Sequence, residues 1–199
     1  MRIVVLVSGR GSNFQAIIDN INTGNLSVSC AGMVTDNPCA YAIERARSAG
    51  ILTTVIDYHA YPSRLEYEVE LLAVLKRLDP DLVVLAGYMR ILGKEVVLEY
   101  KGRMINIHPS LLPAFPGLHA QAQALAYGVK IAGCTVHFVD EKMDAGPIIL
   151  QRSVVVKGDD TTEMLEERIL AEEHIALSDA IRLFCEGRLA ICDRRVIIS

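Results

Sequence analysis

The sequence predicts an α/β protein of one domain, built on a doubly wound, mostly parallel sheet of seven strands. A long C-terminal helix and a short terminal hairpin follow the sheet. Three observations predict this class. Short β-branched apolar runs alternate with helical segments through the first two thirds of the chain. These runs are short and continuously apolar, whereas strands with one solvent-exposed face alternate apolar and polar residues. They are therefore typical of parallel strands covered on both faces. The length of 199 residues fits one domain.

The first five predicted strands share a core of Val, Ile and Leu. They are Ile3–Val7, Val28–Val34, Thr53–Ile56, Leu82–Ala86 and Met104–Ile107. Helical spacing appears between them in Phe14–Ile21, Tyr41–Ala49 and Arg64–Leu78. In the third helix the expected apolar stripe consists of Leu65, Val69, Leu72, Leu75 and Leu78. Pro80 then ends that helix before the next strand.

The pattern changes after residue 108, which divides the chain into predicted halves, 1–108 and 109–199. Pro109–His119 has no clear period and is predicted to be an ordered loop, a kind of loop that is usually functional. Two longer strands follow, Ala132–Val139 and Ile148–Val156, joined by Asp140–Pro147. The long helix Thr162–Cys185 can be capped by Asp160, Thr161 or Thr162 and ended by Gly187, and Leu189–Ile198 is predicted to be the hairpin.

Composition excludes several classes of protein. The net charge is −4 with 20 basic and 24 acidic residues, so there is no basic surplus of the kind that phosphate-driven nucleic-acid binding needs. The cysteines form an odd set without a CxxC pair, which indicates free thiols in a reducing compartment: Cys30, Cys39, Cys134, Cys185 and Cys192. Ile3–Val7 is too short for a signal peptide or a membrane span. We therefore expect a soluble, cytoplasmic protein.

A glycine-rich turn follows the first strand, Ser8-Gly9-Arg10-Gly11-Ser12-Asn13. Its glycines permit a tight turn, and the N–H groups of the following helix start attract a phosphate or carboxylate. The turn lacks the third glycine of the dinucleotide fingerprint and the Gly-Lys-Ser/Thr of the P-loop, so a monophosphate is the better prediction. The alternative is that Ser12 and Asn13 only cap the helix.

Asn106 and His108 end the fifth strand and point to the same side of it. An amide donor beside an imidazole can stabilise an oxyanion and move a proton. Asp144 becomes functional if the fold brings it beside His108, where it would orient the ring and stabilise its charged form. The alternatives are a structural histidine and a solvated acidic turn.

Other polar residues give weaker signals. Thr135 and His137 share a face of their strand and are candidates to line the same cleft. His119 and His174 are interpreted as ordinary loop and helix residues. The spacing of the histidines argues against a metal site. Ser8 and Ser110 lack a local base, and no G-x-S-x-G elbow is present.

Together these segments resemble the phosphoribosylglycinamide formyltransferases, folate-dependent enzymes of purine synthesis. The matching segments are Ile3–Asn13, Leu85–Leu92, Asn106–Pro113, Pro116–His119, Thr135–Val139 and Asp144–Pro147. The resemblance covers essentially the whole chain and implies a Rossmann-like formyltransferase fold. It also implies 10-formyltetrahydrofolate as formyl donor, a phosphoribosylglycinamide acceptor and no metal. Small-molecule partners are expected, with neither nucleic acid nor membrane, and a homodimer is left open.

The resemblance further implies a role for individual residues. Gly11, Ser12 and Asn13, with Arg10 nearby, would hold the substrate phosphate, and Glu173 would bind the ribose hydroxyls. The catalytic residues would be Asn106, His108 and Asp144. The folate site would comprise Arg64, Met89, Arg90, Ile91, Leu92, Asn106, Asp140, Glu141, Lys142, Met143 and Asp144. Two positions depart from the family pattern, Leu170 and the pair Leu177-Ser178, and the pair is interpreted as a packing difference.

Three alternative functions remain open at this level. Methionyl-tRNA formyltransferase would need a basic RNA-binding extension, which this acidic chain lacks. A formyltetrahydrofolate hydrolase would normally carry an N-terminal regulatory domain, whereas Met1 here directly precedes the first strand. A non-catalytic folate or nucleotide sensor would need the phosphate turn but not Asn106, His108 and Asp144.

Overall fold

The computed structural model describes all residues, 1–199, and divides into two compact units, Met1–Ile105 and Asn106–Ser199. The first unit ends at Ile105, three residues before the predicted end of the first half. That the chain forms a single domain stays a prediction. None of the helices combines the length and apolar character that crossing a bilayer requires.

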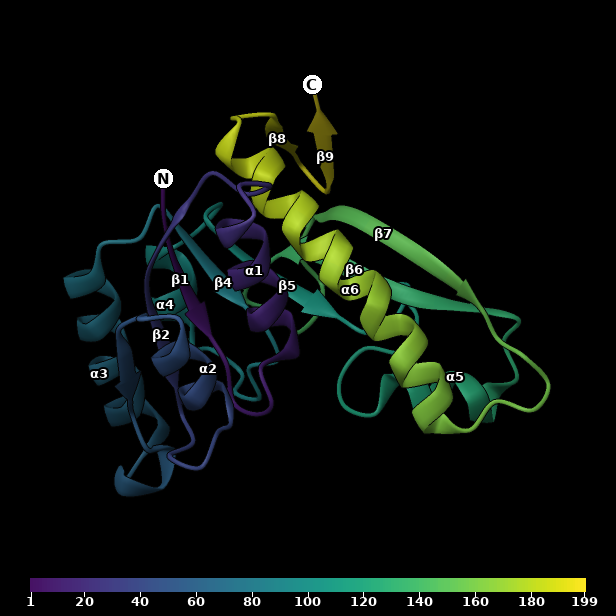
Figure 1. Cartoon of the computed structure of the whole chain (residues 1–199), viewed down its shortest axis with the longest axis horizontal. Helices are drawn as coiled ribbons and strands as arrows, with labels where there is room; N and C mark the ends of the chain where they lie inside the picture. The colour runs from purple at the N-terminus through teal and green to yellow at the C-terminus, as the bar shows by residue number, and fades with distance from the viewer. The chain divides into compact units, whose positions relative to one another are not determined.

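The first unit is a parallel sheet in the order β3-β2-β1-β4. Its strands are β1 (Arg2–Leu6), β2 (Ser29–Thr35), β3 (Thr53–Val55) and β4 (Leu82–Leu85). β1 and β4 are buried on both faces, as their continuous apolar runs predict. Because parallel strands all point the same way, the segments after β1, β2 and β4 emerge at one edge of the sheet (Figure 1). That edge is where ligands bind in open α/β sheets.

The helices of this unit are α1 (Ser12–Asn22), α2 (Ala42–Ser48), α3 (Arg64–Leu78) and α4 (Lys94–Glu99), with the short 3₁₀ helix η1 (Tyr58–Ala60). The predicted apolar stripe of α3 is wrong at its start. Leu65 and Val69 are 62% and 58% exposed, and Tyr67 and Leu71 are buried instead. Two stripes of α3 carry apolar residues, and packing of the Tyr67 ring against Tyr58 and Tyr61 selects the second.

The strand β5 (Met104–His108) runs across the boundary between the units. The second unit then contains α5 (Ala120–Tyr127), β6 (Ile131–Phe138), β7 (Ile148–Val155), α6 (Thr162–Cys185), β8 (Leu189–Cys192) and β9 (Arg195–Ile198). β6 and β7 pair antiparallel, and α6 lies across both strands (Figure 1). Thr161 caps α6 by accepting the N–H of Met164 at 3.3 Å, one of the caps that the sequence allowed.

The chain has nine strands in its sheet rather than the seven predicted. The terminal hairpin accounts for the difference, because β9 pairs in parallel with β7 through Ile148 and Arg195, and β8 pairs antiparallel with β9. The hairpin therefore extends the sheet instead of standing apart from it. The helices η1, α4 and α5 were also not predicted, because each is short and none shows a clear 3.6-residue apolar period.

Candidate active site

The turn Ser8–Asn13 after β1 is held by its carbonyl groups. Two of these carbonyls accept side-chain donors: Ser8 O accepts Asn37 Nδ2 at 3.1 Å, and Arg10 O accepts Arg45 Nε at 2.8 Å. The other two accept backbone donors: Gly9 O accepts the Ala42 N–H at 3.1 Å, and Gly11 O accepts the Gln15 N–H at 2.9 Å. The first N–H groups of α1, which begins in this turn, have no carbonyl partner within the helix. Successive N–H groups at a helix start form a concave anion site.

Gly11 makes this turn possible. It is the N-cap residue of α1 with φ +69°, and no side chain caps the helix, so the alternative in which Ser12 and Asn13 serve as caps is wrong. A Cβ at Gly11 would lie 2.8 Å from Cβ of Ala42, too close for any side chain. Both the left-handed backbone and the contact with α2 therefore require glycine here. Arg10 is exposed beside it, and Asn13 is buried.

The segment after β4, Gly87–Gly93, is fixed by side chains from two other parts of the chain, the turn after β1 and α3. Ser8 Oγ accepts the N–H of Met89 at 2.8 Å, and Gly87 O accepts the N–H of Ser8 at 3.0 Å. Glu68 Oε1 accepts the N–H of Gly93 at 2.8 Å, and the hydroxyls of Tyr67 and Tyr88 share a short hydrogen bond. We call Met89–Leu92, the part of this segment expected to bind folate, the folate strip.

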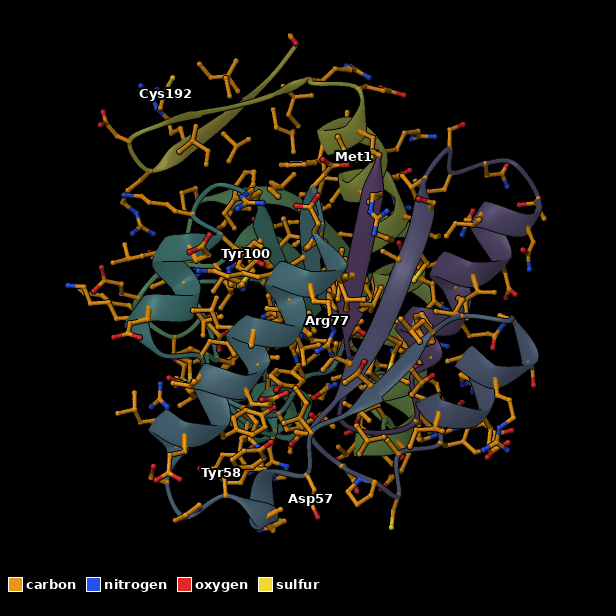
Figure 2. All side chains as sticks on the ribbon, turned by 90° about the vertical axis from the view of Figure 1, so that its left-hand side faces the viewer. Met1, Asp57, Tyr58, Arg77, Tyr100 and Cys192 are labelled. Atoms are coloured by element: carbon orange, nitrogen blue, oxygen red, sulfur yellow. The ribbon has the colours of Figure 1, made fainter.

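The side chain of Arg90 is already engaged within the protein. Its Nε donates to Asp36 Oδ2 at 2.6 Å, and its guanidinium lies 3.9 Å from the centre of the Tyr58 ring. Asp36 is 2% exposed, so this ion pair is shielded from solvent on the carboxylate side. Figure 2 shows Tyr58 at the end of the unit opposite Met1, the end at which β1 finishes. Arg90 therefore offers a ligand its backbone rather than its charge.

A cavity of about 250 Å³ lies beside the folate strip. Its lining consists of Tyr58, Arg64, Tyr67, Glu68, Met89, Arg90 and Ile91. Each arginine forms an ion pair, Arg64 with Glu68 at 2.6 Å and Arg90 with Asp36. The lining therefore combines tyrosine rings with charged side chains whose charges cancel. Burial raises the pKa of Tyr67 to about 12, which keeps its hydroxyl protonated at neutral pH. Such a lining suits a flat, polar, aromatic ligand.

In the second unit, His108 and Asp144 meet as the sequence predicted. Nδ1 of His108 lies 3.5 Å from Oδ2 of Asp144, and its Nε2 bonds the carbonyl of Phe115 at 2.9 Å. The N–H of Gly117 also donates to Asp144 Oδ2 at 2.8 Å. Both ring nitrogens of His108 thus face oxygen atoms, Nδ1 that of the Asp144 carboxylate and Nε2 that of the Phe115 carbonyl.

His137 completes the cluster. It is 2% exposed, and its Nδ1 bonds the carbonyl of Phe138 at 2.8 Å, so Nδ1 carries the hydrogen. Burial is the main cause that lowers the pKa of His137, and the neutral ring leaves Nε2 as an acceptor. Nε2 lies 3.2 Å from Asn106 Nδ2 and 3.8 Å from Asp144 Oδ1. This contact fixes which end of the Asn106 amide is the donor, and leaves its second N–H for a ligand.

The loop between β6 and β7 delivers Asp144 to this cluster. Asp140 Oδ1 accepts the N–H of Lys142 at 2.9 Å, which folds the start of the loop, and Asp144 adopts a left-handed φ of +50°. Gly146 packs so closely that a Cβ there would lie 1.8 Å from the carbonyl oxygen of Phe138. In contrast, Glu141, Lys142 and Met143 are exposed at the tip of the loop.

Thr135 does not line a cleft as expected. It is fully buried, donates its hydroxyl to Ser110 O at 2.7 Å and accepts the N–H of Leu112 at 3.0 Å. Gln151 adds bonds to Leu112 O at 2.9 Å and to Thr135 Oγ1 at 3.0 Å. These two side chains therefore support the loop after His108, which carries the carbonyl of Phe115.

Among the remaining candidates, the role expected of Glu173 stays a prediction, and His119 and His174 lie in a loop and a helix as the sequence indicated. Glu173 is buried on α6. The pKa of Cys134 is raised first by burial and second by the negative charge of Glu173. His119 directly precedes α5, and His174 lies within α6. Leu177 is buried on α6, in agreement with a packing role.

Several residues of the site were missed by sequence reasoning. Asp36 follows β2 directly and Ser8 lies two residues after the end of β1, so a polar residue near a strand's carboxyl end could have signalled both. Tyr58, Tyr67 and Glu68 offered no such signal, because they reach the folate strip from η1 and α3. Phe115 and Gly117 contribute only backbone groups, which any residue carries.

The chain is similar to known formyl-transfer enzymes. Residues 1–181 match the formyl transferase family. Phosphoribosylglycinamide formyltransferase of Escherichia coli (strain K12) is 44% identical over 189 residues, 95% of this chain and 89% of that protein. Glycinamide ribonucleotide transformylase 1 from Symbiobacterium toebii has a TM-score of 0.97 and 52% identity, covering 100% of this chain and 93% of that chain. A formyltetrahydrofolate deformylase from Pseudomonas syringae pv. tomato str. DC3000 has a TM-score of 0.93 at 28% identity, covering 99% of this chain and 65% of that chain.

These matches confirm the resemblance noted in the sequence and the α/β class. They span nearly the whole chain at an identity that coincidence does not produce. The chain belongs to the formyl transferase family.

Proposed function

We propose that the protein transfers the formyl group of 10-formyltetrahydrofolate to the amine of 5′-phosphoribosylglycinamide. The products would be tetrahydrofolate and 5′-phosphoribosyl-N-formylglycinamide, a step of purine synthesis. The observation that carries the proposal is the cluster of Asn106, His108, His137 and Asp144, which joins an oriented amide donor to an imidazole paired with a carboxylate.

The reaction needs what this cluster offers. The amine lone pair attacks the formyl carbon, and the carbonyl electron pair moves to oxygen, giving a tetrahedral oxyanion. The Nδ2–H of Asn106 and protonated His108 would stabilise that charge, while Asp144 holds the imidazolium in place. When the intermediate collapses, N10 of the folate leaves and takes up a proton, and the attacking nitrogen loses one. His108 can relay this proton.

The two ligands would use separate features of the first unit. The turn Ser8–Asn13 offers backbone donors to the substrate phosphate, and the folate strip with its cavity offers backbone groups and aromatic faces to the folate. Arg10 would contribute charge beside the phosphate, and Arg64, paired with Glu68, would contact the folate. Glu173 would bind the ribose hydroxyls, and the loop Asp140–Asp144 would contact the folate. The mechanism draws on side chains and backbone alone, and we propose no metal.

One assay separates this function from its alternatives. The protein is incubated with 10-formyltetrahydrofolate, with and without phosphoribosylglycinamide, and deformylated folate is followed by absorbance. We expect folate release only with the amine present, in equal amounts with formylated product. Release without the amine would identify a hydrolase, an alternative that the similarity to a formyltetrahydrofolate deformylase makes worth testing. The absence of turnover would indicate a sensor.

The assay includes a variant that tests the cluster itself. His108→Asn keeps a polar side chain of similar size but cannot hold an imidazolium next to Asp144. We expect it to bind both ligands and to release folate at a rate lower by about 10²-fold or more. Its thermal unfolding should match that of the unmodified protein, which shows that the loss is chemical.

A further inference from the structure

Ser8 is a member of both proposed ligand sites in the first unit. It opens the phosphate turn, since its carbonyl accepts Asn37 Nδ2 at 3.1 Å as the first of the turn's four bound carbonyls. It also bonds the segment after β4 twice, donating its N–H to Gly87 O at 3.0 Å and accepting the N–H of Met89 at 2.8 Å. These two bonds go to the residues directly before and after Tyr88.

The two ligand sites depend on Ser8 to different degrees. The phosphate turn keeps three further carbonyl bonds, from Ala42, Arg45 and Gln15, which involve no atom of the Ser8 side chain. Met89, in contrast, is 60% exposed, so its side chain is not fixed by burial, and its N–H is bound by the Ser8 hydroxyl. Met89 is also the first residue of the folate strip. Its position therefore sets where the strip's backbone groups begin.

The hydroxyl of Ser8 is well placed for such a role. Ser8 is nearly buried, with 7% of its surface exposed, so the bond to Met89 has little competition from water. Within the strip, Arg90 is held by Asp36 and Tyr58, and directly after the strip Gly93 is held by Glu68. Ser8 thus supplies the first of three attachments that define the path of the strip.

We propose that Ser8 is a positioning residue for the folate donor: its hydroxyl fixes the folate strip in register with the phosphate turn. The proposal rests on the proposed function, because it assumes that the backbone of Met89–Leu92 receives the folate. Loss of the hydroxyl frees the Met89 N–H and the strip loses its first attachment. Folate binding then weakens, while the phosphate turn keeps its own supports.

A matched pair of variants isolates the hydroxyl. Ser8→Thr and Ser8→Val have side chains of the same shape, and only the threonine can accept the Met89 N–H. Calorimetry measures the Kd of tetrahydrofolate and, separately, that of phosphoribosylglycinamide; no formyl group is present, so nothing reacts. The Val variant should bind tetrahydrofolate about threefold to tenfold more weakly than the Thr variant, the range expected for one net hydrogen bond. Both should bind phosphoribosylglycinamide within about twofold of each other.

Kinetics give a second readout that a general loss of stability would not produce. In Ser8→Val the KM for 10-formyltetrahydrofolate should rise by the same factor as the Kd, with kcat within about twofold of that of Ser8→Thr. Thr23→Ala serves as control, because it removes a hydroxyl bond to Asp19 O at 2.9 Å at the end of α1, outside both ligand sites. It should leave the KM for folate unchanged.

The outcomes distinguish this proposal from the proposed function. Equal folate binding by the Thr and Val variants, in a protein that transfers formyl groups normally, would overturn the role of Ser8 alone. Equal losses for both ligands in the Val variant would also overturn it, since Ser8 would then support the whole edge of the sheet. An unmodified protein that binds no tetrahydrofolate would overturn both proposals.

Discussion

Oδ2 of Asp144 is shared between two partners: Nδ1 of His108 at 3.5 Å and the N–H of Gly117 at 2.8 Å. The same imidazole reaches the carbonyl of Phe115 through Nε2 at 2.9 Å. The loop after His108 therefore contacts both the ring and its carboxylate, and Thr135 and Gln151 donate hydrogen bonds to carbonyls of that loop. Asp144 acts in this arrangement as an acceptor for the ring and as an anchor for the loop.

Replacing Asp144 by Asn should separate its role beside the His108 ring from its role as acceptor of the Gly117 N–H. The amide keeps an oxygen for the Gly117 N–H but loses the negative charge that stabilises an imidazolium. We expect kcat to fall about 10²–10³-fold, the typical cost of removing one preorganised electrostatic contact, with both ligand affinities within a few fold. Steady-state kinetics and calorimetry measure the two quantities. Asp140→Asn, on the same loop, should alter KM for folate more than kcat. Turnover like that of the unmodified protein would make Asp144 a turn residue only.

Gly11→Ala should weaken phosphoribosylglycinamide binding and leave tetrahydrofolate binding nearly intact. The added Cβ meets Ala42, and the left-handed backbone costs roughly 1–2 kcal/mol for a non-glycine residue. We expect unfolding at a lower temperature and a substrate Kd higher by about tenfold or more. Adding Ala42→Gly removes the 2.8 Å contact with Cβ of residue 42 but neither the 3.2 Å approach to its Cα nor the backbone strain, so it should restore only part of both losses. Equal weakening of both ligands would point to general misfolding.

His137 should make the protein sensitive to mild acid. Its pKa is lowered by burial in the folded state, so between that value and about 6.5 the unfolded chain binds a proton that the folded chain does not. The contribution of His137 to the free energy of unfolding is fully present above pH 6.5 and is lost as the pH falls below that value. The free energy of unfolding can decrease by up to about 1.4 kcal/mol for each pH unit in this range. Urea unfolding at pH 7.5 and 5.5 should show a smaller decrease for His137→Gln than for the unmodified protein. An identical decrease in both proteins would exclude His137 as the source.

The five cysteines should differ sharply in reactivity. Burial raises the pKa of Cys30 to about 11 and that of Cys134 to about 12, whereas Cys39 and Cys192 are exposed. The thiolate is the reactive form, so iodoacetamide at pH 8 should label Cys39 and Cys192 first. Peptide mass spectrometry follows each site over time. Cys134 should be labelled only after addition of denaturant, and rapid labelling in the folded protein would contradict its buried position.

The sequence predicted the parallel strands and the location of the site because both follow from local patterns. An apolar run such as that of β1 is buried on both faces, and polar residues at the carboxyl ends of parallel strands meet at one edge. Asn106 and His108 were proposed on this basis and Asp144 from the family resemblance, and the structure brings the three into one cluster around His137.

What the sequence could not provide depends on contacts between distant segments. Either stripe of α3 satisfies the helical period, and only the packing of Tyr67 decides between them. The pairing of β9 with β7 joins residues far apart in the chain, which hairpin propensity does not encode. The bond between His137 and Asn106 depends in the same way on how two strands lie in register.

The fate of the formyl carbon distinguishes transfer to the glycinamide amine from hydrolysis. A single turnover with 10-formyltetrahydrofolate carrying a ¹³C-labelled formyl group, in the presence of phosphoribosylglycinamide, is followed by NMR. We expect the labelled carbon to move to the glycinamide nitrogen and appear as a formamide, with none released to solvent. We also expect Asp144→Asn to slow this transfer without changing the product. Appearance of the label as free formate, with or without the amine, would contradict formyl transfer and identify the protein as a hydrolase.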